Sequence, residues 1–197
     1  MTVEIRGNLS ANTLVLSEKF RRYSTGSILF TGEGARVEID GPVTSGDIAL
    51  AIGSHAAVSI GPDCVIGRLS LNAFGAGARI DIGREVGFAG VVNLSTNEGG
   101  RISIGAHCLI AGDTVFSASD FHEIFDVATG ERLNQARDIR VEEHVWIGAR
   151  AMVLKGAQIG RDSAIGAGAI VTGSFEPNSL IVGNPARVVR SGVNWRH

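Results

Sequence analysis

The sequence lacks a strong net charge, a long apolar run and a leader-like beginning. Its net charge at neutral pH is −2, and without a basic field we expect no association with nucleic acid or an anionic membrane surface. Nowhere do about 18 apolar residues run together, as a membrane span requires. The first five residues carry neither the cationic stretch nor the apolar run of a signal peptide. We therefore expect a cytoplasmic protein without a membrane span.

Proline is also scarce, with four residues, whereas glycine is abundant, with 27. Such a composition occurs in flexible low-complexity chains. Here, however, the glycines stand between regularly spaced Ile and Val, which indicates tight corners joining short strands. Hydrophobic residues make up 44% of the chain, so it can bury a core, and residues 1–197 suit a single domain.

Aliphatic residues recur at every sixth position in the C-terminal half. An α-helix needs a period of 3.6 and a sandwich strand a period of two, so this period fits neither. Small residues stand four positions after most of these aliphatics, for example Ala157 and Ala169. The series is Val141, Ile147, Val153, Ile159, Ile165 and Val171.

A coarser repeat of aliphatic pairs runs upstream, with spacings of 21, 22 and 22 residues. A unit is therefore three hexapeptides plus about four residues, which predicts a triangular coil with one aliphatic per side pointing inward. Stacked coils pair their backbones with the coils above and below. The pairs are Val37/Ile39, Val58/Ile60, Ile80/Ile82 and Ile102/Ile104.

Three segments depart from the repeat. Residues 1–30 show no clean period, and we expect an irregular first coil or cap. Residues 117–138 interrupt the repeat, because the pairs on either side are 37 residues apart where 22 is expected. Long loops in a compact array are usually functional, so this segment is the expected catalytic loop. Residues 172–197 are expected to form a C-terminal tail.

Four motifs resemble the hexapeptide-repeat acetyltransferases, a group that includes galactoside, maltose and capsular-polysaccharide (sialic acid) O-acetyltransferases. The resemblance implies an all-β fold, a left-handed parallel β-helix of hexapeptide repeats with one long protruding loop. It also implies acetyl transfer from acetyl-CoA to a hydroxyl of a sugar or polysaccharide, without a metal, by a homotrimer with active sites at subunit interfaces. The motifs are Ser-Asp-Phe-His (119–122), His-Val-Trp-Ile-Gly-Ala (144–149), Ile-Gly-Ala-Gly-Ala-Ile-Val-Thr (165–172) and Pro-Asn-Ser-Leu-Ile-Val-Gly-Asn-Pro-Ala-Arg-Val-Val-Arg (177–190).

The resemblance further implies roles for individual residues. His122 acts as general base, the backbone N–H of Ala149 stabilises the oxyanion, and Trp146 borders the acceptor pocket. Imidazole can take a hydroxyl proton near neutral pH, a fixed backbone donor suits a developing oxyanion, and phosphates favour Arg. The coenzyme is expected along Gly148, Ala149 and Ala167, with its nucleotide end near Pro185, Arg187 and Arg190.

Several polar residues admit two interpretations. Asn93 could hydrogen-bond the acceptor, as a substrate-binding residue, or simply occupy a corner. Three carboxylates near His122 could orient its ring or merely keep the loop soluble, and nothing in the sequence chooses among them. They are Asp120, Glu123 and Asp126.

Other residues are expected to be structural. His107 and His144 occupy outward positions, and we expect them to be plain surface residues. Cys64 and Cys108 fall two coils apart on one face, beyond the roughly 7 Å that a disulfide can span, and we expect both in the core.

Three other functions stay open at this point. A metal-dependent carbonic anhydrase of this fold needs three histidines on one ion, two of them close together in the sequence, whereas here no two histidines are close. A non-catalytic scaffold role is disfavoured by the intact motifs. N-acetylation of an amino sugar would use the same base and donor, so the acceptor stays undecided.

Overall fold

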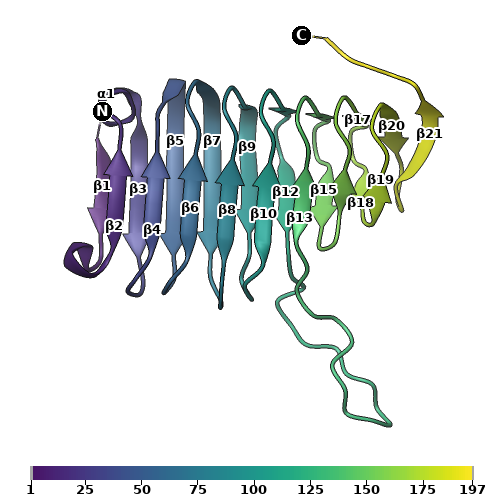
Figure 1. The fold of residues 1–197 in the computed structure, drawn as a ribbon, viewed down its shortest axis with the longest axis horizontal. Helices are drawn as coiled ribbons and strands as arrows, with labels where there is room; N and C mark the ends of the chain where they lie inside the picture. Colours follow the sequence, from purple (N-terminus) through teal and green to yellow (C-terminus); the bar gives the residue numbers. More distant parts are fainter. Residues whose placement is uncertain (1, 197) are drawn as a thin grey trace.

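The computed structural model describes residues 2–196, with the backbone alone for 42–45, and it is a parallel β-helix of about eight coils (Figure 1). The first face of the prism is an eight-stranded sheet. Its strands are β2 (Thr13–Leu16), β4 (Arg36–Ile39), β6 (Ala57–Ile60), β8 (Arg79–Ile82), β10 (Arg101–Ile104), β13 (Ile139–Val141), β16 (Gln158–Ile159) and β19 (Ser174–Phe175).

The second and third faces form one 13-stranded sheet that bends around a corner of the prism. β5, β7 and β9 run across that corner, and in later coils the two sides are separate strands. The strands are β1 (Val3–Arg6), β3 (Thr25–Phe30), β5 (Pro42–Ile52), β7 (Cys64–Ala73), β9 (Gly87–Ser95), β11 (Leu109–Ile110), β12 (Thr114–Ser117), β14 (Trp146–Ile147), β15 (Met152–Leu154), β17 (Ala164–Ile165), β18 (Ile170–Val171), β20 (Ser179–Val182) and β21 (Arg187–Ser191).

The period-six aliphatics form the core, as predicted. All six residues of the series from Val141 to Val171 are at most 2% exposed. The coils also stack in the predicted register, so that Ile80, Ile102 and Ile139 lie above one another on the first face. Burial of each such side chain stabilises the fold by roughly 1.5–3 kcal/mol, and stacking supplies the backbone hydrogen bonds that a single coil lacks.

The corner between the first and second faces carries a row of residues in the left-handed conformation, called here the corner row. Each later member donates its N–H to a carbonyl of the preceding coil, for example His144 to Ala106 at 2.8 Å. Asn and Asp tolerate this conformation better than most residues. The corner row is Asp63, Glu85, His107, His144, Asp162 and Asn178, with φ between 54° and 60°.

Two segments depart from the coil pattern. In the first coil, η1 (Leu9–Ala11) precedes β2, and α1 (Glu18–Tyr23) takes the place of one side. Ser17 caps α1 by accepting the Phe20 N–H at 3.1 Å, and Phe20 is fully buried at this end of the core. The segment between β12 and β13 projects from the prism (Figure 1). No helix among residues 2–196 is long and apolar enough to cross a membrane.

Candidate active site

The residues expected to meet the coenzyme lie along one corner, between the second and third faces. Gly148 donates its N–H to the carbonyl of Ile165 at 2.8 Å, and Gly168 donates to Ala149 at 2.9 Å. One coil further, Ile170 donates to Gly183 at 3.0 Å. The structure therefore stacks Ala149, Ala167 and Pro185 on consecutive coils. We call this line of residues the coenzyme corner.

Close approach of the coils shapes the coenzyme corner. A Cβ added to Gly148 would lie 2.6 Å from the backbone nitrogen of Ala167, so a side chain at 148 would force the coils apart. The N–H of Ala149 donates to no acceptor within the described chain, whereas that of Arg150 donates to Gly112 at 3.0 Å. Ala149 is half-buried at the surface, so its N–H is available to a ligand.

Trp146 lies beside this corner on the outward side of β14. It pairs with Leu109 on one neighbouring coil and with Ala164 on the other. Its side chain is 42% exposed, which is unusual for so large an apolar group. The structure thus brings Trp146, Gly148, Ala149 and Ala167 together.

His122 does not share the coenzyme corner. Its loop leaves the third face after β12 and returns to the first face at β13, at another corner of the prism. Each side holds about six residues and therefore spans roughly 20 Å. The His122 side chain is exposed. A single chain thus supplies the two halves of the expected site at separate corners.

A buried asparagine holds the backbone around His122. Asn134, 8% exposed, donates to the His122 carbonyl at 2.7 Å and to Asp120 Oδ2 at 2.8 Å. Its Oδ1 accepts the N–H of Ile124 at 2.7 Å. Lys155, which follows β15, donates to Asp120 and, at 3.0 Å, to the carbonyl of Asn134. The base of the loop is thereby tied to the third face.

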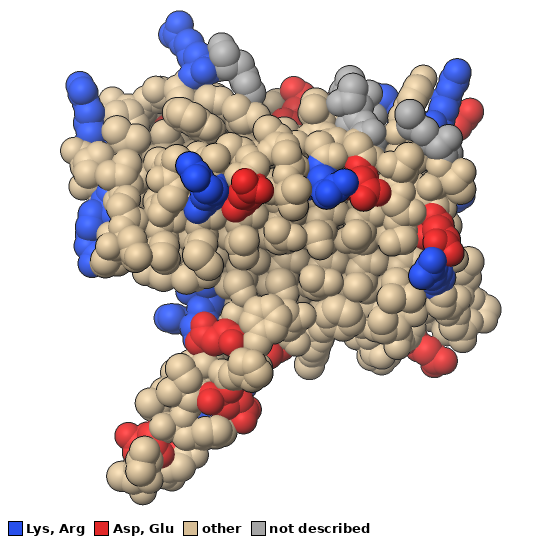
Figure 2. Space-filling view, turned by 180° about the vertical axis from the view of Figure 1, so that it is seen from behind, with Lys and Arg blue, Asp and Glu red and all other residues tan. Residues whose placement is uncertain are grey.

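The three carboxylates near His122 all have other partners. The Lys155 ammonium and the Asn134 amide lower the pKa of Asp120. Glu123 pairs with Arg132 at 3.1 Å. The backbone N–H groups of Thr129 and Ala128 lower the pKa of Asp126 by donating to it. The carboxylates therefore order the loop, and acidic groups gather on it in Figure 2.

Asn93 lies in the middle of a strand, so its interpretation as a corner residue is wrong. It stands on the outward side of β9, paired with Ser70 and Val115, and is half-buried. Because β12 is the neighbouring strand, Asn93 lies one coil from the strand that leads into the loop. Its contact with an acceptor stays a prediction.

Comparisons with known proteins find similar sequences and a similar fold. The sequence model "Bacterial transferase hexapeptide (six repeats)" matches residues 138–173. A polysialic acid O-acetyltransferase of Escherichia coli O1:K1 / APEC is 34% identical over 119 residues, which cover 60% of this chain and 38% of that protein. The galactoside O-acetyltransferase of Escherichia coli K12 is 33% identical over 117 residues, which cover 59% and 56%. The crystal structure of the polySia-specific acetyltransferase NeuO superposes with a TM-score of 0.85 at 26% identity, covering all of this chain and 88% of NeuO.

The chain is therefore similar to hexapeptide-repeat acetyltransferases. It spans 38% and 56% of the length of the two curated relatives described above. A mutant of AntD, an N-acyltransferase from Bacillus cereus, in complex with dTDP and coenzyme A, has a TM-score of 0.57 at 23% identity, covering 68% of this chain and 73% of AntD. That likeness concerns the fold alone.

The remaining predicted residues fall into two groups. Arg187 and Arg190 are exposed on β21, the strand that follows Pro185 at the coenzyme corner, and their contact with phosphate stays a prediction. Cys64 and Cys108 are free and buried, as expected. Burial raises the pKa of the Cys64 thiol to about 11 and that of Cys108 to about 12.

The expectation for His144 as a plain surface residue is wrong. Its Nδ1 lies 2.8 Å from Asp162 Oδ1, and its ring stacks on Trp195. His107 lies on the preceding coil, with its Nδ1 3.2 Å from Glu85. The two histidines are thus neighbours in the corner row, which the sequence conceals because the loop separates them by 37 residues. Among residues 2–196, no three potential ligands are grouped to hold a metal.

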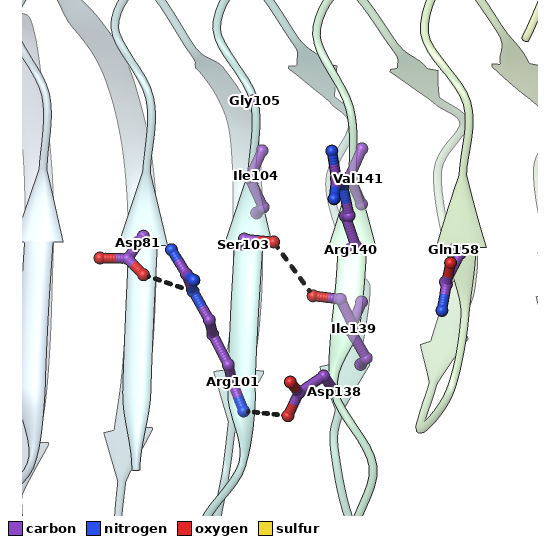
Figure 3. Close-up of a pocket in the computed structure, with 10 residues that line it drawn as sticks. All are labelled: Asp81, Arg101, Ser103, Ile104, Gly105, Asp138, Ile139, Arg140, Val141 and Gln158. Carbon is purple, nitrogen blue, oxygen red and sulfur yellow. Dashed lines mark hydrogen bonds and ion pairs between the residues drawn. The ribbon is translucent and has the colours of Figure 1, made fainter. Parts of the chain in front are cut away.

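A polar hollow of about 600 Å³ on the first face was not anticipated. Figure 3 shows Arg101 between Asp81 and Asp138: its Nε donates to Asp81 at 2.8 Å and its backbone N–H to Asp138 at 2.8 Å. Arg140 and Gln158 line the side toward the later coils. The hollow contains none of the predicted site residues. A search for hexapeptide motifs cannot find it, because its polar side chains occupy outward positions that the repeat does not specify.

Proposed function

We propose that this chain transfers an acetyl group from acetyl-CoA to a hydroxyl of a sugar or polysaccharide. The observation that carries the proposal is the N–H of Ala149, which is available at an exposed corner beside Trp146. Support comes from the relatives, two of which are named as O-acetyltransferases of polysialic acid and of galactosides.

In the proposed reaction, His122 accepts the proton of the acceptor hydroxyl as its oxygen attacks the thioester carbon. The Ala149 N–H donates to the carbonyl oxygen, which carries the new negative charge in the tetrahedral intermediate. The C–S bond then breaks, the ester C–O bond remains, and the coenzyme thiolate takes the proton from His122. Acetyl-CoA is a co-substrate, and no residue of the chain is acetylated.

We further propose a homotrimer in which the loop of one subunit reaches the coenzyme corner of the next. The separation of His122 and Ala149 on different corners of one prism supports this arrangement. The loop also exposes apolar side chains, among them Phe125 at 50% and Val127 at 102%, which favours a contact partner. A cytoplasmic location stays a prediction.

The test of the function is an acceptor screen. The protein is incubated with acetyl-CoA and matched pairs of hydroxyl and amino sugars, including polysialic acid, and the products are measured by mass spectrometry together with thiol release. We expect acetyl esters. Acetylation of amino sugars alone would replace this proposal with N-acetylation, and thiol release without any acetylated product would refute transfer.

A further inference from the structure

The end of the chain returns to the prism. β21 pairs antiparallel with β20 and so reverses the chain, and Gly192 follows with a φ of +71°. Figure 1 shows the last segment turning back along the prism. The Val193 N–H donates to the Asn178 carbonyl at 3.0 Å, and Asn178 Nδ2 donates to the Val193 carbonyl at 3.1 Å. These two bonds fix the tail to the corner row.

Near the end of this returning segment, Trp195 packs against His144. The indole and imidazole rings stack with centroids 4.5 Å apart and planes 14° apart. The indole Nε1 also donates to the His144 carbonyl at 2.8 Å. The imidazole is held in turn by Asp162, whose Oδ1 lies 2.8 Å from its Nδ1. Trp195 is 9% exposed. The tail is therefore a packed part of the fold at this point.

The same indole stands beside Trp146. Their ring centroids are 6.4 Å apart with the planes inclined by 43°, which is a favourable tilted geometry for aromatic pairs. On the next coil Trp146 pairs with Ala164, a residue that is 7% exposed and whose methyl group fills little space. Trp195 thus supplies the large neighbour that fixes the Trp146 ring, while the remainder of that ring stays open to solvent.

We propose that Trp195 is a positioning residue for the acceptor pocket. It holds the Trp146 indole in the orientation in which that ring contacts the acceptor sugar. This inference rests on the proposed function, in which Trp146 borders that pocket. Two inclined rings give a fixed apolar wall, suited to the apolar face of a sugar ring. The hydrogen bonds that stack the coenzyme corner do not involve Trp195, so its role concerns the acceptor and not the coenzyme.

The chain has two tryptophans, so an indole exciton couplet in circular dichroism reports on this pair alone. We expect the couplet in the wild-type protein and its loss in both Trp195→Ala and Trp195→Phe. In kinetics, Trp195→Ala should raise the acceptor KM about three- to tenfold and leave the acetyl-CoA KM unchanged. Trp195→Phe, which keeps a ring, should restore the acceptor KM. Val189→Ala, at an exposed position of β21, is the matched control.

Thermal unfolding establishes that each variant folds. If Trp195→Ala does not fold, Trp195→Leu, which fills part of the space without a ring, carries the test and should raise the acceptor KM in the same way. The inference is overturned if folded Trp195→Ala keeps the wild-type acceptor KM, or if both KM values rise together. A wild-type protein without a couplet refutes the ring contact itself. A wild-type protein with the couplet that acetylates no acceptor refutes the proposed function instead.

Discussion

At the scale of single residues, His122 presents an exposed side chain on the loop, so its removal deletes no buried contact. We expect His122→Ala to lower the turnover number by about 10²–10⁴, because the acceptor hydroxyl loses its general base. The free energy of unfolding should change by no more than about 0.5 kcal/mol, and the dissociation constant of coenzyme A should not change. Steady-state kinetics, calorimetric titration and thermal unfolding measure the three quantities.

His107→Ala is the matched control for this variant. His107 is another surface histidine, whose ring lies beside Glu85, but it lies in the corner row and away from the loop. His144 is unsuitable because its ring supports Trp195. Loss of activity in His107→Ala, with activity retained in His122→Ala, would contradict the assignment of the base.

Cys64 and Cys108 bear on whether an acetyl-enzyme forms. Their raised pKa values, about 11 and about 12, keep both thiols protonated at neutral pH, and a protonated thiol is a poor nucleophile. We expect no protein-bound label after incubation with radiolabelled acetyl-CoA in the absence of an acceptor. Stoichiometric label on either cysteine would refute direct transfer.

At the scale of elements, the loop depends on the bonds made by Asn134. Asn134→Ala removes the hydrogen bonds that Asn134 makes with the His122 carbonyl and the Ile124 N–H. Each buried polar group left without a partner lowers the free energy of unfolding by about 1–3 kcal/mol. We expect faster hydrogen exchange across 119–134 and a lower turnover number, with unchanged coenzyme binding. Glu131→Ala, at an exposed position of the same loop, is the control. Unchanged exchange in Asn134→Ala would show that the loop is held by other contacts.

The same anchor should respond to acid. Because the pKa of Asp120 is lowered in the folded protein, its contribution to stability is present above the ordinary carboxyl pKa of about 4. It is lost as pH falls through the lowered value. We expect hydrogen exchange in the loop to rise in that acidic range in the wild-type protein, and this rise to be absent in Asp120→Asn. A rise of equal size in both would assign the effect to another group.

The coenzyme corner is testable through its exposed methyl groups. Ala167→Trp places a large ring where the pantetheine arm is expected, so the acetyl-CoA KM should rise about tenfold or more. The acceptor KM should stay unchanged. An unaltered acetyl-CoA KM would place the coenzyme elsewhere.

At the scale of the whole molecule, the site is expected to need more than one chain. Sedimentation should show a homotrimer, and mixing should show shared sites. Subunits of His122→Ala refolded together with subunits of Ala167→Trp should regain activity, because some interfaces combine an intact loop with an intact corner. A fully active monomer, or mixed trimers without recovered activity, would contradict the shared site.

The sequence by itself determined the coil, because a six-residue period of aliphatics admits one way to bury them all. It also located the loop, since residues 117–138 could not be placed in that period. The stacking of Ala149 and Ala167 at one corner followed from the repeat, where spacing fixes position along the coil. Binding of the coenzyme at that corner stays a prediction from the family resemblance.

Only the tertiary structure decided which side chains meet across coils. Asn134 and Lys155 are separated from Asp120 by 14 and 35 residues, and Trp195 lies 51 residues from His144. Outward positions of a β-helix carry no periodic constraint, so their sequence does not record their neighbours. Stacking brings together residues one coil apart, and a loop inserted between coils hides that proximity. The packing of Trp195 against His144 and Trp146 is therefore a property of the folded prism that no local pattern predicts.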